Sequence, residues 1–158
     1  MYARNSATGS GASAYATIGL QSAAMSASPH QLITMLFDGA KTAITMARHH
    51  MANKEIVAKG NAISKAINII DNGLKASIDA EAGGAAEIAL AANVSALYDY
   101  INQRLLYANL RNDPALLDEA DRLLDNISSA WREIDPHKPS YAPHASAAPA
   151  TARLSIGA

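Results

Sequence analysis

Apolar side chains recur at helical spacing along most of the chain, and their intervals predict four helices. The first, at about 29–52, carries a stripe of Leu32, Leu36, Ala40, Ala43 and Ala47. The second, at about 55–79, carries Ile56, Ile63, Ile67, Ile70, Leu74 and Ile78. The third, at about 85–111, carries Leu90, Val94, Leu97, Ile101, Leu105 and Ala108. The fourth, at about 114–134, has one broad face of Leu116, Ala120, Leu123, Leu124, Ile127, Ala130, Trp131 and Ile134.

Local signals fix where these helices begin. Ser28, Pro29 and Gln31 provide a cap, a preferred first residue and the far member of a capping box. Asp113 and Pro114 do the same for the fourth helix. The connections are short, so sequential helices should run antiparallel. The sequence therefore predicts an all-α, antiparallel up-down four-helix bundle.

Composition divides the chain into three parts. Residues 1–27 are rich in Ala, Ser and Gly but include Tyr15, Ile18, Leu20 and Met25, which is typical of a mobile N-terminal arm with a few apolar contact points. Residues 28–135 hold the helical bundle. Residues 136–158 combine prolines with alanines, serines and histidines and few large apolar groups, so a disordered C-terminal tail is expected.

Charge and hydropathy exclude several classes of partner. The chain has 13 basic and 14 acidic residues, and no basic cluster of the kind that nucleic-acid binding requires. No segment approaches the ~20 apolar residues of a membrane-spanning helix, so membrane insertion is not expected. The absence of cysteine fits a reducing compartment, and we expect a cytoplasmic protein.

The usual signatures of catalysis are missing. The sequence has neither the Glu-x-x-His pairs of di-iron bundles nor the His-Glu-x-x-His of zinc proteases. His49 and His50 are adjacent and therefore about 100° apart on a helix, which is poorly suited to one metal ion. A glycine-rich stretch at 9–14 imitates a dinucleotide fingerprint, but no strand precedes it. We expect no enzyme activity, no cofactor and no metal.

Three helices carry apolar residues beyond their main stripes. In the first helix, Met35, Gly39, Thr42 and Met46 form a second row of small residues between methionines, a combination that suits a shallow peptide groove. A neighbouring helix packed on that row would give the same pattern. Ile69 in the second helix could likewise belong to a groove, and so could a row in the third helix formed by Ile88, Ala92, Leu106 and Leu110. The alternative for both is cover by the C-terminal tail, the N-terminal arm or another helix.

Five segments resemble one known family. They are SPHQLITMLFDGA (28–40), SKAINIIDNGLKAS (64–77), LYDY (97–100), ANLRND (108–113) and NISSAW (126–131), and their order and spacing are similar to those of the FliS-type flagellar secretion chaperones. The resemblance implies a helical bundle around which the disordered C-terminal segment of flagellin wraps. Such a chaperone prevents premature polymerisation and delivers flagellin to the flagellar type III export apparatus. The alternative is a bundle adaptor or chaperone for another secretion client.

The resemblance also implies site residues. Contacts with the client are expected at Met35, Phe37, Asp38, Ile69, Asn72, Leu97, Tyr98, Ile101 and Arg104. Tyr15 and Ile18 match an arm that acts as a displaceable lid and contacts the export gate component. The stretch from Gly83 to Leu97 is about one helical turn longer than is usual for the family. A weak homodimer of the client-free protein is left open.

Overall fold

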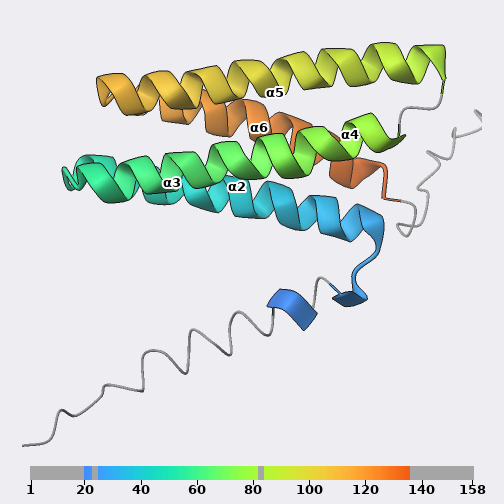
Figure 1. Cartoon of the computed structure of the whole chain (residues 1–158), viewed down its shortest axis with the longest axis horizontal. Coiled ribbons are helices and arrows are strands. Elements are labelled where there is room, and N and C mark those ends of the chain that lie inside the picture. The colour runs from blue at the N-terminus through green and yellow to red at the C-terminus, as the bar shows by residue number, and fades with distance from the viewer. Residues whose placement is uncertain (1–19, 23–24, 82–83, 136–158) are drawn as a thin grey trace, which may run out of the picture.

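The computed structural model describes residues 20–22, 25–81 and 84–135. The helices are α2 (Pro29–Ala52), α3 (Ile56–Ile69), the π-helix η1 (Ile70–Lys75), α4 (Ala76–Glu81), α5 (Ala85–Arg111) and α6 (Pro114–Glu133). Because α3, η1 and α4 follow one another without a break, they form one continuous rod. Figure 1 shows this rod beside α2, with α5 and α6 completing the bundle. The predicted all-α, antiparallel four-helix bundle is confirmed for the described residues.

The expected helix starts are confirmed in detail. The Ser28 hydroxyl accepts a hydrogen bond from the Gln31 amide at 3.2 Å, and the Gln31 side chain accepts one from the Ser28 amide at 2.9 Å. Asp113 caps α6 by accepting a hydrogen bond from the Ala115 amide. Each capping group satisfies a backbone donor that the first turn of a helix leaves unpaired. The predicted arm up to residue 19 and the predicted tail at 136–158 lie outside the described residues.

Polar pairs at matching heights hold antiparallel neighbours in register. Between α2 and α6 these pairs are Lys41 with Asp125, Arg48 with Asp118 and Asp38 with Arg132. Lys41 also lowers the pKa of the Asp125 carboxyl, through their hydrogen bond first and its charge second. All three pairs are solvent-exposed to some degree, so they specify alignment more than they add stability.

A buried lysine joins α3 to the turn between α5 and α6. Lys59 is almost fully buried, and its ammonium donates to the Asn109 carbonyl at 3.0 Å and to the side chain of Asn112. Asn112 has a positive φ of 50°, a left-handed conformation that asparagine tolerates well. The lysine thereby satisfies carbonyl groups where α5 ends.

The second helix differs from its predicted form, because a π-helix interrupts it at Ile70–Lys75. Gly73 lies in this segment, and a Cβ added there would stand 3.0 Å from Leu36 Cδ2. The missing side chain lets α2 and the second helix approach closely at this height. The periodicity of 3.6 residues predicts an uninterrupted α-helix here and does not reveal the π-helix.

Two glycines should respond oppositely to alanine. At Gly60 the nearest atoms to an added Cβ are those of Asn109 at 3.9 Å and 4.0 Å, so Gly60→Ala should raise the free energy of unfolding by about 0.5–1 kcal/mol through helix propensity. The free energy of unfolding of Gly73→Ala should be about 1–2 kcal/mol lower than that of Gly60→Ala, because Leu36 must move. Urea denaturation measures both. Equal stabilisation by the two substitutions would contradict the close approach.

Candidate functional site

An apolar cavity of about 490 Å³ opens at one end of the bundle. It lies where the start of α2, α4, the first half of α5 and the end of α6 meet (Figure 1). Its lining includes Ile33, Phe37, Ile78, Leu90, Val94 and Trp131. Such a volume is within the range of sites that bind ligands through apolar side chains.

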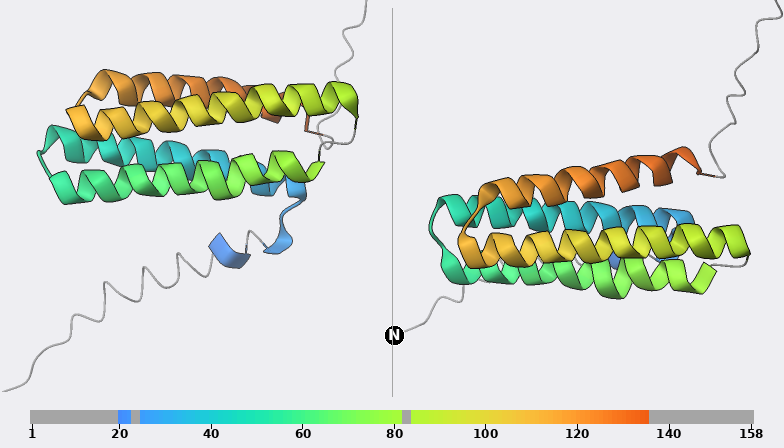
Figure 2. Two further views of the ribbon diagram at one scale, coloured as in Figure 1. Left: turned by 45° about the horizontal axis from the view of Figure 1, so that its top comes forward. Right: turned by 90° about the horizontal axis from the view of Figure 1, so that it is seen from above.

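The cavity follows from the paths of the helices. Toward its C-terminal end α6 diverges from the other helices (Figure 2, right). Side chains that continue the core stripes then have no partner opposite them. Leu90 was expected to be a member of the core, but it is 65% exposed. The buried core ends at Phe37 and Tyr98, which border the cavity.

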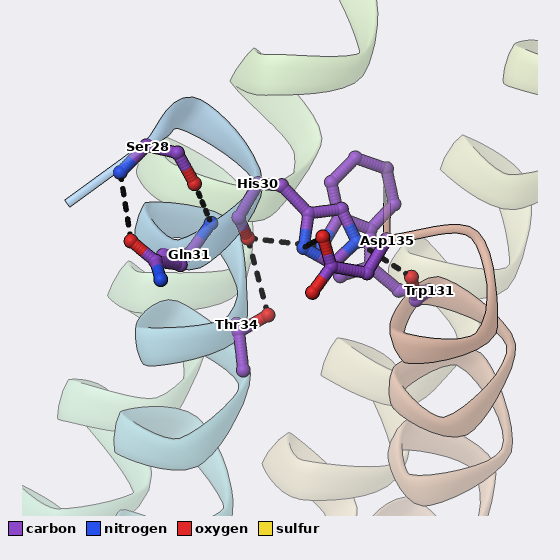
Figure 3. A network of polar contacts seen from close by, with 6 residues as sticks. All are labelled: Ser28, His30, Gln31, Thr34, Trp131 and Asp135. Carbon is purple, nitrogen blue, oxygen red and sulfur yellow. Dashed lines mark hydrogen bonds and ion pairs between the residues drawn. The ribbon is translucent and has the colours of Figure 1, made fainter. Parts of the chain in front are cut away.

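Trp131, a member of the cavity wall, forms a pair of aromatic rings with His30 (Figure 3). His30 stacks on Trp131 with ring centroids 4.7 Å apart and an interplanar angle of 9°. The Trp131 indole donates to the His30 carbonyl at 3.2 Å, and His30 Nε2 lies 2.8 Å from the Trp131 carbonyl. Since a carbonyl only accepts, Nε2 carries the proton of that bond. We call this pair the His30–Trp131 clasp; it ties the end of α6 to the start of α2.

The chemistry of the cavity wall is that of a binding surface. Its polar members are Ser77 and Tyr98, and burial raises the pKa of the Tyr98 hydroxyl above its usual value. The phenol is therefore neutral under ordinary conditions. A wall without charge selects apolar side chains and discourages charged ones.

A second apolar region lies on the outer surface, near the start of α3 and the end of α5. Val57 is 77% exposed, and Leu106 and Leu110 are 52% and 76% exposed. Near the start of α5, Ile88 is also exposed. The alternative in which another helix covers this row of α5 is wrong for the described residues, since these side chains remain accessible.

The structure separates the predicted client-binding residues into groups. Phe37 and Tyr98 lie together in the cavity wall. Met35 lies outside the bundle, in a shallow hollow of about 310 Å³ that includes His30, Thr34 and Arg132. Asp38 is nearby and pairs with Arg132 at 2.5 Å.

The remaining predicted residues lie on other faces. Ile69 is half-buried with its Cδ1 3.5 Å from the Cβ position of Gly39, and Asn72 is exposed with its amide bonded to Asn68. Arg104 lies over the Tyr100 ring at 4.6 Å and pairs with Glu119 at 3.5 Å.

Two further predicted contacts belong to α5. Leu97 is half-buried against the core. Ile101 has no exposed surface, so a client cannot reach its side chain in this structure and we assign it to packing. Tyr15 and Ile18 lie outside the described residues.

Sequence reasoning missed the cavity itself. Leu90, Val94, Ile78 and Trp131 were placed on core faces, and their periodicity is indeed that of core residues. No local signal distinguishes an apolar stripe that ends in an open cavity from one that is covered. His30 received no structural role, although Trp131 stacks on it.

Two other kinds of site are missing from the part of the chain that the structure describes. No group of three or more His, Asp or Glu side chains among those residues is arranged to hold a metal ion. None of the helices described is both long and apolar enough to cross a membrane.

Fold and site together define a helical-bundle binding protein with an open apolar surface. Residues 11–138 match the family described as flagellar protein FliS, and the chain belongs to this family. It is similar to the flagellar secretion chaperone FliS of Salmonella typhimurium, with 57% identity over 129 residues that cover 82% of this chain and 93% of the relative. The Escherichia coli protein of the same name is 49% identical, over 78% of this chain and 88% of its own length. The Bacillus subtilis protein is 30% identical, over 72% and 80%. The family is one of chaperones and not of enzymes, so this chain is a flagellar secretion chaperone.

Proposed function

We propose that this chaperone binds the disordered C-terminal segment of flagellin in the bacterial cytoplasm. By covering that segment it would prevent premature polymerisation and deliver the subunit to the flagellar type III export apparatus. The observation that carries the proposal is the open apolar cavity bounded by Phe37, Leu90 and Trp131, which a client's apolar side chains can fill. Membership of a secretion chaperone family supplies the biological setting.

The free energy of this binding would come from apolar anchors. Burial of each large aliphatic group contributes about 1.5–3 kcal/mol, and the cavity and the row with Leu106 and Leu110 offer several such places. A client that is disordered when free loses conformational entropy as it orders, which offsets much of this gain. The result is a complex that forms readily and can release its client at the export apparatus.

Within this proposal the predicted contacts have different roles. Phe37 and Tyr98 form the wall that receives an anchor, whereas Met35, Ile69 and Asn72 lie where a segment of client can pass over the outside of α2 and the second helix. Asp38, Leu97 and Arg104 remain proposed contacts with the client at the edges of these surfaces. Tyr15 and Ile18 remain proposed as the part of the arm that contacts the export gate component.

Calorimetric titration with a peptide of about the last 40 residues of flagellin from the same organism tests the proposal. One-to-one binding with a clearly negative heat-capacity change is expected, because apolar surface leaves water as the peptide orders. No heat at tens of micromolar protein, with an unrelated disordered peptide giving the same trace, would contradict flagellin as the client.

The same titration tests Met35. Met35→Asp places a charge in the proposed path of the client, and we expect binding to weaken about tenfold while the helical content and melting temperature stay nearly unchanged. Thr45→Asp puts the same charge on an exposed position of the same helix and should leave affinity within about twofold. Joint loss of fold and binding in Met35→Asp would instead make Met35 a core residue.

A further inference from the structure

The cavity lies beside the point where the described chain stops. Ile134 is part of the cavity lining and is itself largely exposed, and Asp135 is the last described residue before 136–158. The chain that follows therefore leaves from the rim of the cavity. Any apolar group on it starts close to an open apolar site.

That following segment contains one pair of aliphatic residues. Its sequence is PHKPSYAPHASAAPATARLSIGA, and Leu154 and Ile156 are its only large aliphatic side chains. Residues two apart point to the same side of an extended chain, so both side chains of this pair can enter one cavity. A volume of about 490 Å³ has room for two such groups.

The connection is long enough to reach the cavity. Eighteen residues separate Asp135 from Leu154 in the sequence, and a flexible chain of that length spans about 25 Å on average. Attachment at the rim gives an effective concentration on the order of millimolar, far above that of a free competitor in a cell. A weak apolar contact is enough to keep such a segment in place.

We propose that Leu154 and Ile156 occupy the apolar cavity of their own chain when no client is bound. The family match ends at residue 138, so the pair lies beyond the part that defines the family. Of the N-terminal arm, the described residues Leu20 and Met25 are exposed and neither is part of the cavity lining, so neither of them fills the cavity.

Occupation of the cavity has a consequence for client binding. A client anchor that uses the cavity must first displace the pair, which lowers its apparent affinity by the fraction of chains whose cavity is free. This step rests on the proposed function, whereas occupation of the cavity does not. The segment would take the place of the client's anchor and shield the apolar surface of the cavity until a client binds.

The chain is well suited to a direct test, because it has a single tryptophan, Trp131, and no cysteine. A nitroxide attached to Ser155→Cys should quench the emission of Trp131, since a nitroxide quenches an indole only at close range. We expect at least a twofold loss of emission relative to the same label at Ser146→Cys, and recovery of emission in urea. Equal emission from the two labelled proteins would overturn the proposal.

Charge substitution provides an independent measurement. Leu154→Asp with Ile156→Asp should raise the acrylamide quenching of Trp131 about twofold, because an empty cavity admits the quencher. Ala148→Asp with Ala150→Asp adds the same charges at the same spacing in the same segment and should change nothing. Quenching that varies with protein concentration between about 1 and 50 micromolar would make a second copy the occupant and overturn the proposal.

Addition of the flagellin peptide to the Ser155-labelled protein separates the two proposals. Recovery of Trp131 emission on peptide binding supports displacement. Peptide binding that leaves emission quenched contradicts displacement, and quenching without any peptide binding supports occupation of the cavity while contradicting the proposed client.

Discussion

Ile101→Ala is expected to lower the free energy of unfolding by about 2–5 kcal/mol. Ile101 is fully buried in the core, together with Ile44, Ile70 and Leu105. Removing three carbon atoms from a close-packed position costs their transfer free energy and leaves a cavity that the neighbours fill only in part. Urea denaturation followed by circular dichroism gives the change directly.

Leu106→Ala is the matched control for this substitution. Leu106 is on the same helix but is 52% exposed, so its truncation should change stability by no more than about 0.5 kcal/mol. Calorimetric titration of both variants with the flagellin peptide then distinguishes a role in core packing from a role in client contact. If Ile101→Ala kept wild-type stability and lost client binding, the contact role implied by the resemblance would be right and our assignment to packing wrong.

The starts of the helices could be predicted because their signals are local. Ser28 and Gln31 bond to each other's backbone amides across three residues, and Asp113 bonds to the amide two residues on. Such contacts need no partner from another helix. The helix predicted over 29–52 is therefore observed over Pro29–Ala52, and that over 114–134 over Pro114–Glu133.

Which side chains are covered could not be predicted from the sequence. Leu117 and Ser128 are buried in α6 although neither was placed on its core face, while Ile134 is largely exposed. Periodicity shows which residues share a face, but coverage depends on the angle between neighbouring helices. Leu90 has the spacing of a core residue and lies in the cavity because α6 diverges there.

Packing also decides which of the expected client contacts are accessible. The resemblance indicated Phe37 and Tyr98, and both lie in the cavity wall. It also indicated Ile101, which has the same helical spacing as Tyr98 and Leu105 but no accessible surface. Matching a motif finds the residues around a site, and only the packing shows which of them a client can reach.

The His30–Trp131 clasp provides the second large expected effect. Trp131→Ala removes the stacked ring, its indole donor and part of the cavity wall, and should lower the free energy of unfolding by about 3 kcal/mol. We take the low end of the usual range for tryptophan because Trp131 is only half-buried. Ile134→Ala, at an exposed position of the same wall, should cost about 0.5 kcal/mol or less.

Trp131→Phe isolates the hydrogen bond from the ring. Phenylalanine keeps an apolar ring over His30 but cannot donate to the His30 carbonyl, so a loss of about 1 kcal/mol is expected. A double-mutant cycle of Trp131→Ala with His30→Ala should give a coupling of about 1 kcal/mol, because each ring is the other's partner in the stack. The two hydrogen bonds run from each ring to the other residue's backbone carbonyl, which both substitutions retain. A coupling near zero would mean that the rings are adjacent without stabilising each other. The end of α6 would then be held by its ion pairs with α2, and the cavity would be free to widen when a client enters.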